Sequence, residues 1–245
     1  MTDMRADPSI LPLVVEGLGF EADGRALLAD VGFTLRRGRP TVVLGPNGAG
    51  KSLLLRLCHG LIAPGTGAVR WAADEGVAAG RKRHAMVFQK PVILRRSVRA
   101  NLDHALSAAG TDSAGRAART AAALVRFGLT ALADAPARRL SGGEQQRLAI
   151  ARAWALGPEV LFMDEPCANL DPGSTARIES LVSDLASEGV TVVMTTHDLG
   201  QARRLAERVL FLDKGRLVED APADRFFDAP ETPQAAAFLR GDLLW

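Results

Sequence analysis

Short apolar runs, many rich in β-branched residues, alternate along the chain with longer stretches of helical spacing. The runs have the length and composition of buried strands, and residues 178–186, between two of them, have the pattern of a helix. The predicted strands cover residues 13–18, 31–35, 40–44, 160–163, 190–195 and 209–212. A turn at residues 22–25 separates the first two, which predicts a β-rich, antiparallel start. The later alternation predicts a parallel α/β sheet.

A helical segment is expected between about residues 97 and 155, where the chain becomes rich in alanine and arginine. Its leucines recur at helical spacing, at Leu102, Leu106, Leu124 and Leu132. After the last predicted strand, Lys214-Gly215 lies between two apolar stretches, which predicts a hairpin. Two short helices, separated by the prolines at positions 230 and 233, are expected to follow the hairpin.

Composition narrows the class of protein. The chain has 245 residues, of which 47% are hydrophobic, so it can bury a substantial core. A net charge of +2 gives no reason to expect a nucleic acid as partner. The two cysteines show neither a disulfide framework nor metal-ligand spacing, which suits a reducing compartment. No signal peptide and no apolar run of about twenty residues, the length of a membrane-spanning helix, is seen.

The first candidate for chemistry is the sequence GPNGAGKS at residues 45–52. It follows a predicted strand and precedes a leucine-rich helical pattern, so its free backbone N–H groups can bind phosphate oxygens at a helix N-terminus. In this pattern Lys51 reaches the β- and γ-phosphates, and the Ser52 hydroxyl binds Mg²⁺. The predicted nucleotide-binding residues are Gly45, Pro46, Asn47, Gly48, Ala49, Gly50, Lys51 and Ser52.

A pair of carboxylates, Asp164 and Glu165, follows the apolar strand at residues 160–163. At the carboxyl end of a strand both can reach the phosphate site. We expect Asp164 to hold Mg²⁺ through water and Glu165 to act as general base on an attacking water. The strand before the pair argues against a simple turn or helix cap.

The sequence LSGGEQ at residues 140–145 resembles the signature of the ATP-binding cassette (ABC) ATPases, and the resemblance extends over nearly the whole chain. The family's other motifs follow in order, including Gln89 in a Val-Phe-Gln context and His197 in Thr-Thr-His-Asp. The resemblance implies a P-loop (RecA-like) α/β fold over residues 12–245. Its nucleotide-binding core would comprise residues 12–96 and 156–245, and an inserted helical signature subdomain residues 97–155.

The resemblance also implies roles for single residues. Gln89 would sense Mg²⁺ and the attacking water, and His197 would contact the γ-phosphate. In the family two subunits pack head to tail, so that the signature of one closes over the ATP of the other. The residues implied on that second side of the nucleotide are Ser141, Gly142, Gly143, Glu144 and Asp171.

Phe20 is the best match to the aromatic that stacks on adenine in this family, which usually has tyrosine there. The chain contains no tyrosine, and Phe20 could instead belong to the core.

The resemblance is to importer ATPases that work through a separate membrane permease and, indirectly, a secreted or periplasmic substrate-binding protein. The chain would then lie at the cytoplasmic face of the membrane. The segment 88–101 looks like that of tungstate importers and less closely like that of phosphate or molybdate importers. An exporter or lipid-transport ATPase, and a soluble non-transport ATPase, are alternatives. Loss of Lys51 or Glu165 would signal a scaffold without turnover, and both are present.

Overall fold

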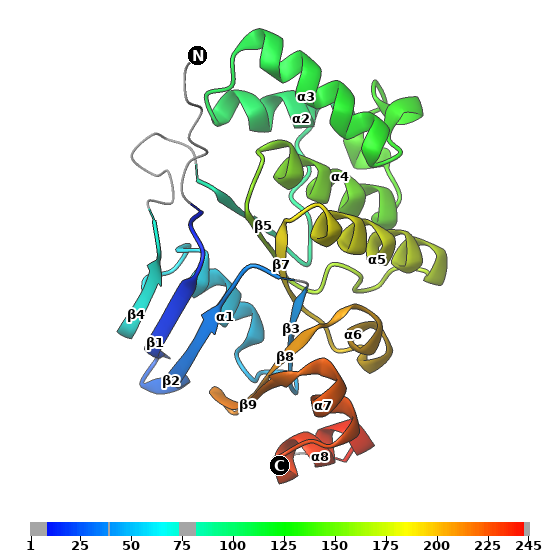
Figure 1. Cartoon of the computed structure of the whole chain (residues 1–245). Helices are drawn as coiled ribbons and strands as arrows, with labels where there is room; N and C mark the ends of the chain where they lie inside the picture. Colours follow the sequence, from blue (N-terminus) through cyan, green and yellow to red (C-terminus); the bar gives the residue numbers. More distant parts are fainter. Residues whose placement is uncertain (1–8, 39, 74–81, 243–245) are drawn as a thin grey trace, which may run out of the picture.

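The computed structural model describes residues 9–38, 40–73 and 82–242 and contains two β-sheets. The smaller, antiparallel sheet has the strand order β2-β1-β4 and lies at the left of Figure 1. Its strands are β1 (Leu13–Ala22), β2 (Arg25–Leu35) and β4 (Thr66–Trp71). The predicted antiparallel start is therefore confirmed, with longer strands than expected. The sequence pattern had not indicated β4.

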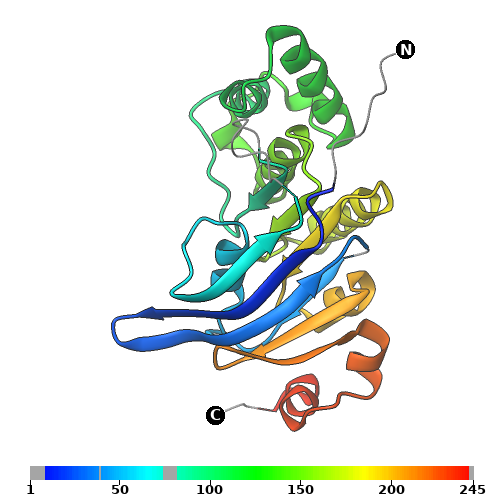
Figure 2. The ribbon, with the colours of Figure 1, turned by 60° about the vertical axis from the view of Figure 1, so that its left-hand side comes forward.

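The larger sheet has six strands in the order β5-β6-β7-β3-β8-β9. They are β3 (Thr41–Leu44), β5 (His84–Val87), β6 (Val160–Met163), β7 (Thr191–Thr195), β8 (Arg208–Asp213) and β9 (Arg216–Pro222). The first five in that order run parallel, which confirms the predicted parallel sheet, and β9 pairs antiparallel with β8 through the predicted hairpin. Figure 2 shows the long hairpin of β1 and β2 in front of this sheet.

Helices connect and cover the strands. They are α1 (Lys51–Cys58), α2 (Val98–Ala108), α3 (Ser113–Arg126), α4 (Gly142–Ala155), α5 (Pro172–Ser187), α6 (Leu199–Leu205), α7 (Ala223–Asp228) and α8 (Pro233–Arg240). Two short 3₁₀ turns, Thr130–Leu132 and Ala137–Arg139, lie between α3 and α4. The helices α2 to α4 form a layer at the top of Figure 1, where the sequence predicts a helical segment, and α7 and α8 lie at the bottom.

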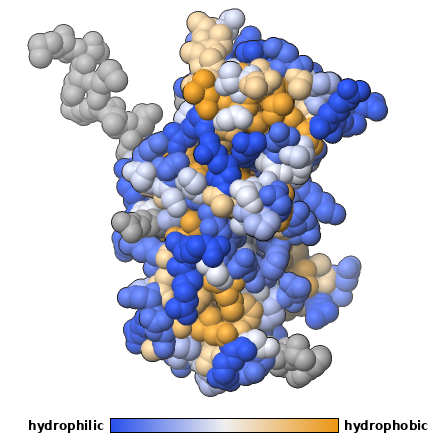
Figure 3. Space-filling model, turned by 90° about the vertical axis from the view of Figure 1, so that its right-hand side faces the viewer, coloured by the Kyte–Doolittle hydropathy of each residue, from blue (hydrophilic) through white to orange (hydrophobic). Residues whose placement is uncertain are grey.

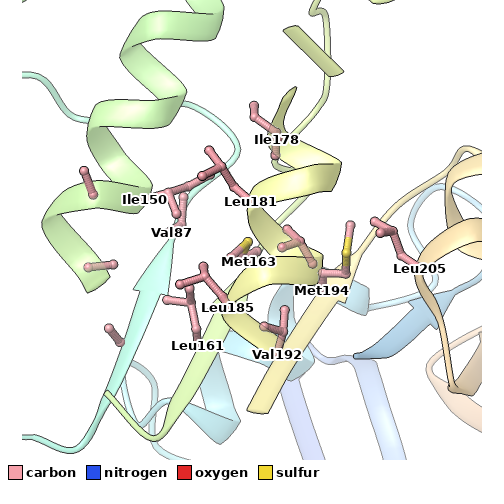
Figure 4. Close-up of a cluster of buried hydrophobic side chains, with 14 of the residues drawn as sticks. Val87, Ile150, Leu161, Met163, Ile178, Leu181, Leu185, Val192, Met194 and Leu205 are labelled. Atoms are coloured by element: carbon pink, nitrogen blue, oxygen red, sulfur yellow. The ribbon is translucent and has the colours of Figure 1, made fainter. Parts of the chain in front are cut away.

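Each face of the six-stranded sheet has its own hydrophobic core, because successive side chains of a strand point to opposite faces. In β6, Leu161 and Met163 join the core that continues into the helical layer, whereas Val160 and Phe162 join the core beneath the three-stranded sheet and α1. Figure 4 shows the first core, with Leu181 and Leu185 of α5 packed over the strands. The strands that carry the phosphate loop and the site residues are therefore packed on both faces by a hydrophobic core.

The outer surface is mostly polar on the side drawn in Figure 3, with two hydrophobic areas. One lies at the height of the helical layer and the other at the height of the C-terminal helices. Val125 of α3 is 70% exposed and belongs to the helical layer.

Candidate active site

The phosphate loop joins the central strand β3 to α1, as the sequence predicts. Gly45 has a φ of 147°, and a methyl group there would overlap the carbonyl oxygen of Leu212 in the neighbouring strand β8. Gly50 has a φ of 99°, and an added Cβ would lie 2.6 Å from a methyl carbon of Leu28. Larger residues at these two positions would push the loop out of its place, so glycine is needed for the close packing.

Lys51, the first residue of α1, is 6% exposed and lies inside the loop. Its ammonium group donates hydrogen bonds to the carbonyl oxygens of Gly45, at 2.8 Å, and Pro46, at 3.0 Å. Burial lowers the pKa of Lys51, and the carboxylates of Glu165 and Asp164 partly oppose that effect. The loop thus holds a cation at the start of a helix, where the backbone N–H groups also favour an anion.

Asp164 ends up beside this loop, directly after β6, and is 3% exposed. One of its carboxylate oxygens, Oδ1, accepts hydrogen bonds from the hydroxyl of Ser52, at 2.7 Å, and from the hydroxyl of Thr195, at 2.9 Å. Of the three residues predicted at the Mg²⁺ site, Ser52 and Asp164 are therefore in direct contact, whereas Gln89 contacts Glu165. Sequence reasoning did not single out Thr195, although a hydroxyl at the end of the apolar strand β7 was a signal.

Glu165 lies at the centre of the other predicted catalytic residues. Its Oε2 accepts a hydrogen bond from the side-chain amide of Gln89, at 3.1 Å, and lies 3.0 Å from Nδ1 of His197. Three chain segments that are remote in sequence, after β5, β6 and β7, bring these side chains together. Glu165 is also one of few non-glycine residues here with a positive φ, 43°.

The residues present fit a magnesium nucleotide. Within the described part of the chain, no group of three or more His, Cys, Asp or Glu side chains is arranged to hold a metal ion. Mg²⁺ does not need one, because it is commonly bound by one or two carboxylates together with waters and phosphate oxygens. The hydroxyl of Ser52 and the carboxylate of Asp164 are hard oxygen donors of that kind, next to the loop suited to phosphates.

The signature residues lie at the start of α4, away from these groups. Ser141 is the N-cap, and its hydroxyl accepts a hydrogen bond from the backbone N–H of Glu144. The carboxylate of Glu144 in turn accepts hydrogen bonds from the hydroxyl and the backbone N–H of Ser141, both at 2.8 Å. These hydrogen bonds from Ser141 lower the pKa of Glu144. In this chain the helix start is thus already occupied by an anionic side chain.

The same helix start packs against the region of Asp171 rather than the phosphate loop. A Cβ at Gly142 would lie 3.4 Å from Leu170, and one at Gly143 would overlap Ser174 of α5. Asp171 is exposed and caps α5 by accepting a hydrogen bond from the N–H of Ser174 at 2.9 Å. Hydrogen bonding to the side chain of Ser174, and then to its backbone, lowers the pKa of Asp171. Among the described residues, no hydrogen bond joins residues 141–144 to residues 45–52.

Phe20 was predicted either to stack on adenine or to belong to the core, and its position in the structure is compatible with both. It is half-buried and packs against the core beneath the three-stranded sheet. It is also in register with Leu28, the residue that contacts Gly50 of the phosphate loop. A side chain with one face in the core and the other exposed near the loop can still stack on a base, and this role remains a prediction.

Comparison with known proteins decides the family. The family model described as "ABC transporter" matches residues 28–168, more than half of the chain. The chain belongs to the ABC transporter family. It is therefore an ATP-binding protein of the kind that hydrolyses ATP to drive transport, and the predicted fold class and activity are confirmed.

Individual relatives agree with this assignment. Over 95% of this chain and 88% of the relative, it is 36% identical to phosphate import ATP-binding protein PstB 2 of Natronomonas pharaonis. It is also 36% identical to tungstate uptake system ATP-binding protein TupC of Peptoclostridium acidaminophilum, over 89% of this chain and all of the relative. The solved structure of CbiO1 of Clostridium perfringens, part of the ABC transporter complex CbiONQ, superposes with a TM-score of 0.80 at 29% identity, covering 91% and 92% of the two chains.

No helix among the residues that the structure describes has the length and apolar character needed to cross a bilayer.

Proposed function

We propose that this ABC ATPase is the ATP-binding and hydrolysing subunit of an importer. It couples closure of a head-to-tail dimer on Mg-ATP to the movement of a small oxyanion through a separate permease. The observation that carries the hydrolytic part is the contact of Gln89 and His197 with the same oxygen of Glu165. These three side chains lie at the carboxyl ends of parallel strands, where open α/β sheets bind their ligands.

In this mechanism the residues of the site have separate roles. Lys51 and the backbone N–H groups of the phosphate loop, to which Pro46 contributes none, would bind the triphosphate, and Ser52 and Asp164 would hold the metal ion. Mg²⁺ supplies electrostatic stabilisation of the charge that develops on the phosphates. Glu165 accepts a proton from the attacking water, while Gln89 and His197 orient its carboxylate and the γ-phosphate.

The head-to-tail dimer supplies what a single chain lacks near the γ-phosphate. The second side of the nucleotide would come from the N-terminus of α4 in the other copy, with Ser141 and the N–H groups of Gly142 and Gly143 as phosphate ligands. Asp171 would contact across the same interface. The separation of α4 from the phosphate loop in one chain, and the exposure of Ser141 and Asp171, support this arrangement.

A groove of about 320 Å³ between the segment after β5 and α4 is suited to the permease. Phe88 and Val92 are exposed at its rim, by 37% and 66%. Arg152 of α4 donates a hydrogen bond to the carbonyl oxygen of Val92 at 2.6 Å, so the rim is tied to the helix that begins with the signature. A partner docked here would contact the segment that begins with Gln89 and the signature helix together, at the cytoplasmic face of the membrane.

Tungstate is the preferred cargo, with phosphate or molybdate as alternatives. It is supported by the resemblance of segment 88–101 and by the likeness to a tungstate uptake protein, while the likeness to a phosphate import protein supports the alternative. A secreted or periplasmic binding protein would deliver the anion. An exporter ATPase and a soluble non-transport ATPase remain the competing functions.

The test is to purify the chain with its membrane partners and to measure uptake of labelled tungstate into vesicles. We expect uptake that needs Mg-ATP and is competed by unlabelled tungstate more strongly than by molybdate, phosphate or sulfate. Competition led by phosphate would replace the cargo and keep the importer. Purification without any membrane protein, with undiminished ATP hydrolysis, would favour the soluble ATPase. A Lys51→Ala complex serves as the control for ATP-independent leakage.

A further inference from the structure

We infer that Thr195, the last residue of β7, is a positioning residue for hydrolysis: its hydroxyl fixes the backbone of Glu165 in the conformation that presents the catalytic carboxylate. This inference rests on the proposed role of Glu165 as general base. Thr195 does not contact the nucleotide in this scheme and acts through its neighbour.

The Thr195 hydroxyl lies between Asp164 and Glu165 and both accepts and donates a hydrogen bond. It accepts a hydrogen bond from the backbone N–H of Glu165, at 2.8 Å, and donates its own hydrogen to Oδ1 of Asp164, at 2.9 Å. Thr195 is 0% exposed, so water cannot replace either bond in the folded chain. An unpaired N–H group at this position would carry the full cost of its desolvation.

Glu165 needs such a support because of its backbone conformation. Its φ of 43° is in the left-handed region, which a residue with a Cβ seldom adopts and which persists when surrounding contacts hold it. The preceding N–H, of Asp164, still pairs with the carbonyl oxygen of Val87 in the neighbouring strand β5. The chain thus leaves the sheet at Glu165, and its N–H finds the Thr195 side chain instead of a strand.

The same strand end holds Glu165 at a second point. His197, two residues after Thr195, lies beside the Glu165 carboxylate, so β7 and its following loop fix both the backbone and the side chain of the proposed base. A shift of about 1 Å in a reacting group can slow an enzyme by about 10²-fold. Loss of the hydroxyl should therefore slow turnover more than it weakens nucleotide binding.

The variant Thr195→Val tests this, because valine keeps the β-branched shape and removes only the hydroxyl. We expect kcat for ATP hydrolysis to fall by about tenfold or more, with the KM for ATP within about threefold of wild type. Thr195→Ser restores the hydroxyl and should recover most of the rate.

A matched control exists on the same strand. Thr191, at the other end of β7, is 1% exposed, and its hydroxyl has no hydrogen-bond partner among the described residues. Thr191→Val makes the identical chemical change at equal burial and should leave kcat unchanged. If Thr195→Val does not fold, Thr195→Cys, with its weak thiol donor, takes its place in the comparison with Thr195→Ser.

The double variant Thr195→Val/Glu165→Gln separates this inference from the proposed function. If Thr195 acts through Glu165, the double variant should be no slower than Glu165→Gln alone. Wild-type kcat in Thr195→Val, or losses that multiply in the double variant, would overturn the positioning role while leaving the base intact. Wild-type turnover in Glu165→Gln would instead overturn the proposed base, and the role of Thr195 with it.

Discussion

Oε2 of Glu165 lies 3.0 Å from Nδ1 of His197, and the two residues follow different strands, β6 and β7. The contact joins the residues that follow β6 to those that follow β7. His197 thus contacts the carboxylate that is proposed to take a proton from water.

The proposed base is tested by Glu165→Gln. The amide keeps the size of the side chain and can still hydrogen-bond, but it cannot accept a proton from water. We expect ATP binding to remain and the hydrolysis rate to fall by about 10²-fold or more. Steady-state hydrolysis and equilibrium nucleotide binding measure the two quantities. Glu188→Gln, which makes the same change at the exposed C-terminal end of α5, is the control. An undiminished hydrolysis rate in Glu165→Gln would mean that Glu165 is not the general base.

The composite site is tested by Ser141→Arg. A long cationic side chain at the start of α4 should block closure between two copies, while each chain still binds ATP at its own phosphate loop. Sedimentation velocity in the Glu165→Gln background should then show monomer with Mg-ATP present. Loss of the helix cap costs about 1 kcal/mol, which thermal unfolding can check. As the control, Ser187→Arg makes the same change at the C-terminal end of α5 and should dimerise normally. A normal dimer of Ser141→Arg would argue against the shared site.

In the proposed dimer the carboxylate of Glu144 in one copy would face the γ-phosphate of the ATP bound to the other copy. Two like unit charges about 4 Å apart repel by about 1 kcal/mol even in water. Glu144→Gln keeps the reciprocal capping hydrogen bonds, since glutamine also serves at this position. The symmetric dimer has two such sites, so we expect the ATP-dependent dimer of the Glu165→Gln variant to form at a roughly 30-fold lower protein concentration when Glu144→Gln is added. A weaker dimer would mean that Glu144 takes part in closure as a carboxylate.

A prediction about pH concerns His59, which follows α1. Its ring is half-buried, with its centroid 4.7 Å from that of His84. Burial, followed by the charges of His84 and Lys82, lowers the pKa of His59 to about 3. Because the unfolded chain binds this proton near pH 6.5 and the folded chain does not, stability present above pH 6.5 is lost as the pH falls towards 3.

The loss attributable to His59 is at most about 2 kcal/mol between pH 7.5 and pH 5. Urea unfolding at the two pH values measures it. His59→Gln should reduce the difference in unfolding free energy between pH 7.5 and pH 5, whereas His104→Gln, at an exposed position of α2, should leave the difference as in wild type. An equal pH dependence in wild type and His59→Gln would mean that His59 titrates normally in the folded chain.

Local pattern and motif spacing accounted for the parts of the fold that are strongly periodic. The central strands were predicted because they are apolar, and in β3 and β7 mainly β-branched, and the phosphate loop because its glycines permit a close approach. β4 and β5 were missed. Every residue of β4 is exposed or half-buried, so no apolar run stands out, and β5, with the sequence HAMV, begins with a histidine and has only one β-branched residue. The structure brings Gln89, Glu165 and His197 together, which no spacing along the chain could show.

Other features depend on contacts that a sequence does not carry. The capping box of Ser141 and Glu144 has the S-x-x-E spacing of such boxes, yet only the structure shows that the carboxylate occupies the helix start. The left-handed backbone of Glu165 and its support by Thr195 result from the meeting of two strands. Phe20 was ambiguous in sequence and is half-buried in the structure, so its stacking on adenine stays a prediction.

The arrangement in which two copies share one nucleotide can be seen in a structure of Glu165→Gln bound to Mg-ATP. We predict that Lys51 of one copy and Ser141 of a second copy both lie within hydrogen-bond distance of the same triphosphate, with Asp171 at their interface. A triphosphate enclosed by one copy, with no group of another copy within hydrogen-bond distance, would contradict the shared site and the proposed coupling of ATP to closure.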